Sequence, residues 1–145
     1  MADISGKLQT KRVATAQAKV YMKKDTLKSL LKGRIPKGDV LSCAKVAGIM
    51  AAKNTSQLIP LCHPLEITDV KIEFKINEKK GFILVKGIVS VLGRTGVEME
   101  ALTAASIAAL TIYDMCKPLD KCITISDIKL IKKTGGKSGT YFRKD

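Results

Sequence analysis

The chain has 145 residues and a formal net charge of +13, with 26 Lys and Arg against 13 Asp and Glu. Hydrophobic residues make up 46% of it and charged residues 27%, which excludes a disordered chain and is typical of a globular protein. The length favours one domain, and we expect a single domain over residues 1–145 with flexible ends near 1–10 and 134–145.

The sequence predicts neither a membrane span nor an export signal. The longest charge-free apolar stretch, 101–113, has 13 residues, which is too short to cross a bilayer. The opening residues, MADISGKLQTKR, contain no apolar segment of a signal peptide. We therefore expect a cytoplasmic protein with no membrane partner.

In chain order, the first predicted elements are a strand and two helices. A loose alternation of apolar residues predicts a strand over 13–22. A short helix over 25–33 follows and ends at Gly33. Asp39 is a favoured N-cap residue, and a helix rich in Ala and Gly runs from it to about residue 54. These small residues would let another backbone approach this helix closely.

The second half of the chain predicts a hairpin and a further strand. Apolar and charged residues alternate over 70–76, residues 78–81 form a turn, and 82–91 make the second strand. A last strand is predicted over 122–131. Paired strands with helices gathered on one side favour an α+β layer fold.

A long helix is predicted over 98–117. Thr95 and Glu98 have the spacing of a capping box, which marks its start and is enough to explain Glu98. Between 101 and 113 the helix is apolar nearly all round. This pattern predicts burial against its own sheet and against a partner.

The stretch 59–65, IPLCHPL, holds the only histidine of the chain. Its two prolines exclude a regular helix or a central strand. A zinc site needs clustered Cys and His, and the four cysteines are scattered along the chain, so no metal ligand is predicted. Cys62 and His63 are adjacent in an extended segment, so their side chains point opposite ways and do not form a nucleophilic pair. We expect His63 to position a substrate by hydrogen bonding, with proton carriage as a further role.

Basic residues concentrate near the two ends of the sequence. Residues 7–37 contain ten Lys and Arg against one acid, and residues 129–145 contain six against one. Such segments suit a phosphorylated small molecule or a nucleic-acid backbone. Aromatic residues are only 4% of the chain and tryptophan is absent, which argues against a module that stacks nucleic-acid bases.

The segment 135–139, GGKSG, resembles part of a phosphate-binding loop. The Walker pattern requires a glycine where this chain has Ile131, so a nucleotide-hydrolase loop is excluded. Glycines flanking Lys137 still leave backbone N–H groups free to meet an anion. A flexible tail is the alternative interpretation.

Ionisable residues mark both ends of the long helix. Glu100 lies beyond the capping positions, and Asp114 and Lys117 share one face at the other end. Their place beside a buried segment favours shifted pKa values for Asp114 and Lys117. Glu100 and Asp114 are 14 residues apart, or roughly 21 Å along a helix. If both ends act in catalysis, two copies of the chain in an antiparallel dimer must build each site.

Four segments in this order closely resemble the molybdenum cofactor biosynthesis protein C family, the cyclic pyranopterin monophosphate synthases. They are KGDVLSCAKVAGIMAAKNT, LIPLCHPL, GRTGVEMEALTAASIAALTIYDMCK and KTGGKSG. The resemblance runs from about residue 3 to 139. It implies a ferredoxin-like α+β fold with helices packed on one face of an antiparallel sheet. It also implies a homohexamer, a trimer of dimers, with sites at the dimer interface.

The resemblance implies a lyase that converts 3',8-cyclo-7,8-dihydroguanosine 5'-triphosphate into cyclic pyranopterin monophosphate with release of diphosphate. It makes Asp114 the general acid/base, with Lys117 as its partner and Lys37 as a further catalytic lysine. The implied substrate contacts are Arg12, Leu61, Cys62, His63, Glu98, Met99, Glu100 and Lys137.

No cofactor is required by this resemblance. A divalent metal can accompany the triphosphate, but no carboxylate cluster in the sequence demands one. Two other classes of protein remain as alternatives, namely a basic nucleic-acid-binding module and a non-catalytic oligomeric scaffold. The scaffold would not need Asp114 and Lys117 together.

Overall fold

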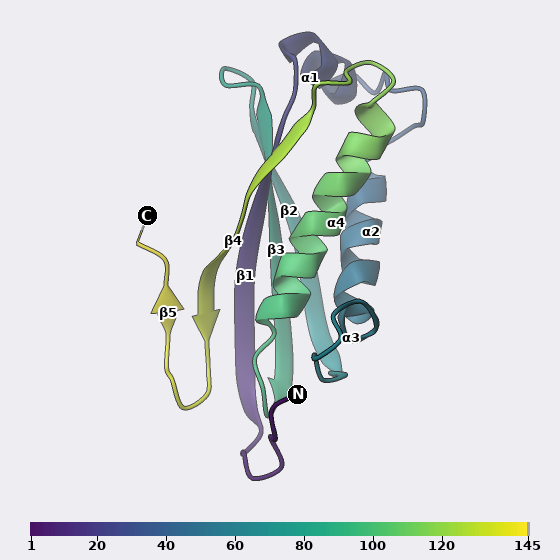
Figure 1. Cartoon of the computed structure of the whole chain (residues 1–145). Coiled ribbons are helices and arrows are strands. Elements are labelled where there is room, and N and C mark those ends of the chain that lie inside the picture. Colours follow the sequence, from purple (N-terminus) through teal and green to yellow (C-terminus); the bar gives the residue numbers. More distant parts are fainter. Residues whose placement is uncertain (145) are drawn as a thin grey trace.

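The structure is a computed structural model that describes residues 1–144. Within these residues, five strands form one antiparallel sheet in the order β2-β3-β1-β4-β5, and helices cover one of its faces (Figure 1). The strands are β1 (Thr10–Tyr21), β2 (Ile67–Asn77), β3 (Phe82–Gly93), β4 (Thr124–Thr134) and β5 (Tyr141–Phe142). The helices are α1 (Lys24–Leu31), α2 (Val40–Lys53), α3 (Thr55–Leu58) and α4 (Glu98–Cys116). The predicted ferredoxin-like α+β fold is confirmed, since helices connect β1 to β2, β2 and β3 form a hairpin, and α4 connects β3 to β4.

The helix-facing side of the central strand β1 carries small apolar residues. Ala14, Ala16 and Ala18 alternate along it and are fully buried. On the neighbouring strand, a Cβ on Gly87 would lie 2.8 Å from the carbonyl oxygen of Ala101 in α4. The absence of bulky side chains here lets the α4 backbone lie directly on the sheet, which places both ends of that helix.

Helix α2 packs against α4 in the same way. A Cβ on Gly48 would lie 3.0 Å from the carbonyl oxygen of Ala104, so the close approach predicted for the small residues of this helix is confirmed. The predicted N-cap is also confirmed, because the carboxylate of Asp39 accepts a hydrogen bond of 3.0 Å from the Ser42 N–H. This cap sets where α2 begins and therefore where the preceding loop lies.

The predicted capping box at the start of α4 is wrong. The N-cap is Val97, no side chain caps it, and Glu98 is the first helical residue rather than the third. The Glu98 carboxylate instead accepts a hydrogen bond from Lys133 of β4. A contact between segments 35 residues apart therefore replaces the local contact that the motif predicts.

Two short elements were not predicted. Helix α3 has four residues and strand β5 has two, so neither is long enough to show a periodic pattern. The strand predicted over 122–131 is β4, and β5 follows it and pairs with it through Phe142 and Tyr141. None of the helices described within residues 1–144 has the length and apolar character that crossing a membrane requires.

Candidate active site

At the C-terminal end of α4, one carboxylate binds two lysines. Asp114 Oδ2 accepts a hydrogen bond of 2.7 Å from Lys37 Nζ, and Asp114 Oδ1 accepts one of 2.7 Å from Lys117 Nζ. Lys37 lies in the loop before α2 and Lys117 is the C-cap of α4. Between 44% and 51% of each side chain is exposed, so a substrate can reach all three. We call these residues the Asp114 cluster.

The charges of the Asp114 cluster stabilise one another. Hydrogen bonds from Lys117 and then Lys37 lower the pKa of Asp114 to about 2. The same contact with Asp114 raises the pKa of Lys117. At neutral pH the cluster therefore holds the ionised carboxylate of Asp114 beside the ammonium group of Lys117. A substrate that separates these charges would bring the pKa values of the pair back toward each other.

At the N-terminal end of α4, the proline-containing stretch and the first turn of the helix line an open hollow of about 370 Å³. We call it the proline hollow. It brings together six of the predicted substrate contacts, which are Leu61, Cys62, His63, Glu98, Met99 and Glu100. The extended segment, the start of α4 and the N-terminal residues Ala2, Ile4 and Lys7 thus form the walls of this hollow.

Glu100 is the buried acid of the proline hollow, with only 4% of the residue exposed. Burial, and then the negative charge of Glu98, raise the pKa of Glu100. Burial also raises the pKa of the Cys62 thiol, and the charge of Glu100 adds to this effect. Cys62 is therefore a neutral thiol at neutral pH and does not serve as a nucleophile there.

Replacing Glu100 with glutamine is expected to increase stability at pH 7 and to leave it unchanged below about pH 4. The pKa of Glu100 is higher in the folded protein than its ordinary value of 4.5, which applies to the unfolded chain. The free energy of unfolding of the parent therefore falls as pH rises from 4.5 through the raised pKa, because the buried carboxyl must then ionise. Urea denaturation of both proteins at pH 4 and pH 7 measures the difference. A variant that is less stable than the parent at pH 7 would contradict the expectation.

Lys133 is a site residue that sequence reasoning missed. Its Nζ donates a hydrogen bond of 2.8 Å to Glu98 Oε1. Burial raises the pKa of Glu98, but this hydrogen bond and the charges of Lys133 and Arg12 lower it overall. Two acids of the same hollow thus differ, since Glu98 is held ionised and Glu100 is driven toward the neutral form. In the sequence, Lys133 is marked only by its position in a basic segment. That position does not indicate which acidic residue it pairs with.

Arg12 lies near the start of β1 and joins three parts of the chain. Its Nε donates to the Gly93 carbonyl at 3.2 Å and its Nη2 donates to the Arg94 carbonyl at 3.1 Å. The loop after β4 folds against Arg12 at Gly136, where a Cβ atom would displace the guanidinium. Gly136 has a φ of +81°, a backbone conformation that favours glycine.

This loop borders a hollow of about 740 Å³, which we call the glycine-loop hollow. Arg12 and Lys137, both predicted substrate contacts, line it together with Ser138 and residues of the N-terminal segment. A smaller hollow beside Arg12 is lined by both Glu98 and Ser138. All the predicted substrate contacts therefore gather around one end of α4.

The Asp114 cluster lies at the other end of α4 (Figure 1). Glu100 and Asp114 are 14 residues apart in one continuous helix, so the two ends are roughly 21 Å apart. The structure thus brings the predicted residues into two groups. Within one copy of the chain the groups do not form a single pocket.

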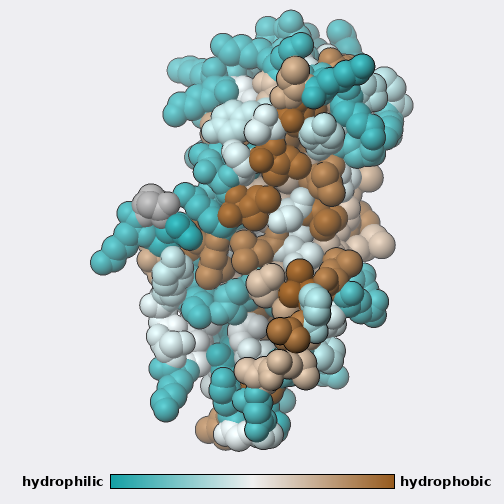
Figure 2. Space-filling view, in the orientation of Figure 1, coloured by the Kyte–Doolittle hydropathy of each residue, from teal (hydrophilic) through white to brown (hydrophobic). Residues whose placement is uncertain are grey.

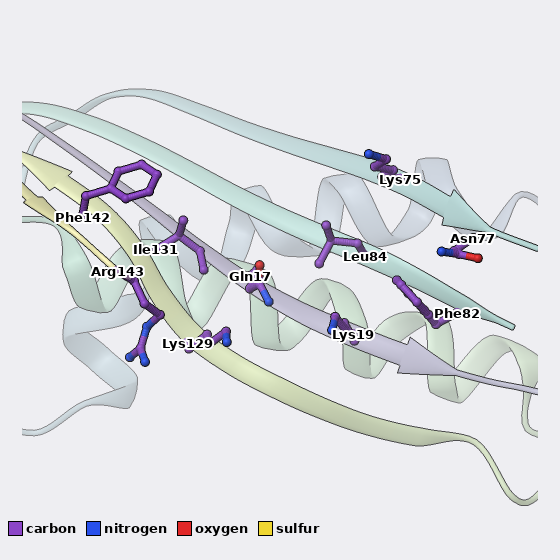
Figure 3. A pocket seen from close by; sticks show the side chains of 10 residues that line it. All are labelled: Gln17, Lys19, Lys75, Asn77, Phe82, Leu84, Lys129, Ile131, Phe142 and Arg143. Carbon is purple, nitrogen blue, oxygen red and sulfur yellow. The ribbon is translucent and has the colours of Figure 1, made fainter. Parts of the chain in front are cut away.

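Another hollow, of about 430 Å³, lies on the helix-free face of the sheet (Figure 3). None of the predicted site residues lines it. Lys19 at its edge pairs with Asp127 at 3.0 Å and lies 5.3 Å from the centre of the Phe82 ring. In residues 1–144 no three or more His, Cys, Asp or Glu side chains are grouped so that they could hold a metal ion.

Comparison with known proteins identifies relatives that match nearly the whole chain. A sequence model of the MoaC family matches residues 1–136. A cyclic pyranopterin monophosphate synthase of Desulfitobacterium hafniense is 61% identical over 145 residues, which cover all of this chain and 88% of that protein. The synthase of the same name from Geobacter metallireducens is 57% identical, over all of this chain and 91% of that protein. The one from Thermoanaerobacter pseudethanolicus is 56% identical, over 99% of this chain and 90% of that protein. The chain belongs to the MoaC family.

Proposed function

We propose that this chain is a cyclic pyranopterin monophosphate synthase, a phosphorus–oxygen lyase of molybdenum cofactor biosynthesis. It converts 3',8-cyclo-7,8-dihydroguanosine 5'-triphosphate into cyclic pyranopterin monophosphate and releases diphosphate. The observation that carries this proposal is the accessible Asp114 cluster, in which a carboxylate binds Lys37 and Lys117 at 2.7 Å each. The relatives that bear this name match nearly the whole chain.

The first part of the reaction opens the guanine-derived ring and rebuilds it as a pterin. These steps move protons to and from nitrogen and oxygen atoms of the substrate. Asp114 accepts protons and Lys117 and Lys37 donate them, as is usual for general acid–base catalysis. His63 lies on the wall of the proline hollow, where it orients the ring by hydrogen bonding.

The second part forms the cyclic phosphate. A substrate hydroxyl attacks the α-phosphorus, a new P–O bond forms, the bond to the β-phosphate oxygen breaks, and diphosphate leaves with that electron pair. Cations stabilise the negative charge that develops on the phosphate oxygens and on the leaving group. Arg12 and Lys137 both line the glycine-loop hollow, which supports this role for them. The reaction needs no further cofactor, although a divalent metal can accompany the triphosphate.

Two copies of the chain build each site in this proposal. The substrate lies in the proline hollow of one protomer and meets the Asp114 cluster of a second. Figure 2 shows apolar residues gathered over the helix layer, and Val46, Met50 and Leu110 of α2 and α4 are each more than half exposed. An exposed apolar face of this kind suits contact with another copy. We further propose a cytoplasmic hexamer, a trimer of dimers.

Purified protein mixed with the cyclised GTP derivative should release diphosphate and form a product with the mass of cyclic pyranopterin monophosphate. Lys37→Ala should lower the rate at least about 100-fold, because it removes a proton donor. Its elution volume should stay that of the parent oligomer. Lys28→Ala, which alters an exposed lysine of α1, is the control and should be fully active. Unchanged turnover in Lys37→Ala would remove that lysine from the mechanism.

A further inference from the structure

We infer that Lys7 binds the phosphate groups of the substrate together with Arg12 and Lys137. The inference rests on the proposed function and adds a residue from the N-terminal segment to the site. It concerns the anionic end of the ligand, a triphosphate before the reaction and a diphosphate after it.

Lys7 lies where two hollows meet. It lines the glycine-loop hollow together with Arg12 and Lys137, and it also lines the proline hollow together with His63 and Glu100. The proposed substrate has two chemically different ends, a ring and a chain of phosphates. A ligand with its ring in the proline hollow can therefore extend its phosphates past Lys7 into the glycine-loop hollow.

The glycine-loop hollow has the charge that phosphates require. Its lining contains three cations, Lys7, Arg12 and Lys137, and no carboxylate. The hydroxyl of Ser138 adds a hydrogen-bond donor. Hydrogen bonds between cationic side chains and phosphate oxygens are among the strongest in proteins.

Several other lysines of the proposed site pair with acids, whereas Lys7 does not. Lys133 pairs with Glu98 at 2.8 Å, and Asp114 pairs with two lysines of its cluster. Across the described residues 1–144, no salt bridge involves Lys7 or Lys137. Their positive charges are therefore available to an anionic ligand.

Local hydrogen bonds give the segment around Lys7 a defined shape. The Lys7 N–H donates to the Ile4 carbonyl at 3.1 Å, and the Ser5 N–H donates to Asp3 Oδ1 at 2.9 Å. This turn holds Lys7 at the rim of both hollows. Lys11 lies only four residues further on and is exposed, but it lines neither hollow. It is therefore a matched control for the effect of removing one positive charge.

The experiment compares the full chain with Lys7→Ala, Lys7→Arg and Lys11→Ala, using initial rates with the cyclised GTP derivative and diphosphate as product inhibitor. Lys7→Ala should raise KM and the inhibition constant of diphosphate each about tenfold, as expected for loss of one charge-assisted hydrogen bond. Its kcat should stay within about twofold of the parent value, because we infer that Lys7 binds the phosphates equally well in the ground state and in the transition state. Lys7→Arg should restore most of the affinity, and Lys11→Ala should match the parent.

Three results would overturn the inference. The first is an unchanged KM and inhibition constant in Lys7→Ala. The second is an equal change in Lys11→Ala, which would indicate a general effect of charge. The third is a lower kcat with unchanged affinity for diphosphate. Elution volume and melting temperature establish that each variant is folded, and Lys7→Gln provides a second neutral variant.

Failure of the proposed function gives a different result. If the parent protein releases no diphosphate, the proposed function is refuted. If the parent is active and Lys7→Ala remains fully active, the inference on Lys7 alone is refuted. Calorimetric titration of the parent and Lys7→Ala with diphosphate then still measures whether Lys7 binds phosphates. Equal affinities of the two proteins in that titration would also count against Lys7.

Discussion

Asp114→Asn is expected to lower kcat by about 100- to 10,000-fold, the usual contribution of a general acid–base group. The amide cannot accept a proton, and it removes the contact that raises the pKa of Lys117. Asp114 is half exposed, so the variant should keep its fold and its assembly. Diphosphate release and the mass of the product measure the effect.

Asp69→Asn is the matched control for this variant. Asp69 is also 51% exposed and also pairs with a lysine, Lys71 at 3.7 Å. It lies on β2 and lines none of the hollows that contain the predicted site residues. It should retain full turnover. If Asp114→Asn were as active as Asp69→Asn, the role of Asp114 in proton transfer would be refuted.

The lowered pKa of Asp114 also determines how the free energy of unfolding depends on pH. In the folded protein the pKa of Asp114 is about 2, below its ordinary value of 3.8. The pairing with the lysines therefore stabilises the fold fully above pH 3.8. This stabilisation is lost as pH falls through about 2. The difference in unfolding free energy between the parent and Asp114→Asn should therefore be constant from about pH 5 to 8. A difference that changes within this range would show that Asp114 titrates there.

Mixed oligomers of two inactive variants are expected to regain activity when the two substitutions lie at opposite ends of α4. Asp114→Asn disables the acid–base end, and Lys137→Ala disables the phosphate end. If each site combines the two ends from different protomers, a mixed dimer has one intact site and one doubly defective site. Random mixing makes about half of the dimers mixed, and half of the sites in each mixed dimer are intact. The mixture should then have about one quarter of the parent activity.

The control pairs two variants from the same end, Asp114→Asn and Lys117→Ala. Every site in that mixture receives one defective Asp114 cluster, so activity should not return. Differently tagged chains, refolded together and purified through both tags, supply the mixed oligomers. No recovery with the opposite-end pair, or equal recovery with the same-end pair, would exclude sites shared between protomers.

Much of this fold could be predicted from the sequence because its signals are local. The alternation along the β2–β3 hairpin, the cap at Asp39 and the small residues of α2 each depend on neighbours within a few positions. The separation of Glu100 and Asp114 along one helix likewise follows from sequence distance alone. Helix position alone indicated Glu100, Asp114 and Lys117 as candidates, whereas the roles of the site residues, and the choice of Arg12 and Lys37, came from the family resemblance.

Contacts between distant segments could not be predicted in this way. Thr95 and Glu98 have the spacing of a capping box, yet α4 begins at Glu98, and that side chain pairs with Lys133 of β4. Nothing in the local pattern distinguishes Lys133 from the lysines beside it. Strand β5 exists only as the partner of β4, since two residues have no pattern of their own.

The sequence alone determined the class of fold, the order of the main elements and the two chemically distinct ends of α4, because each depends on short-range periodicity and spacing. Only the tertiary structure decided which side chains meet. Lys37 contacts Asp114, which is 77 residues away in the sequence, because α2 packs on α4. Arg12 contacts Gly93, which is 81 residues away, because β1 pairs with β3. The physical reason is that a side chain's partners, and with them its charge state, are set by its neighbours in space.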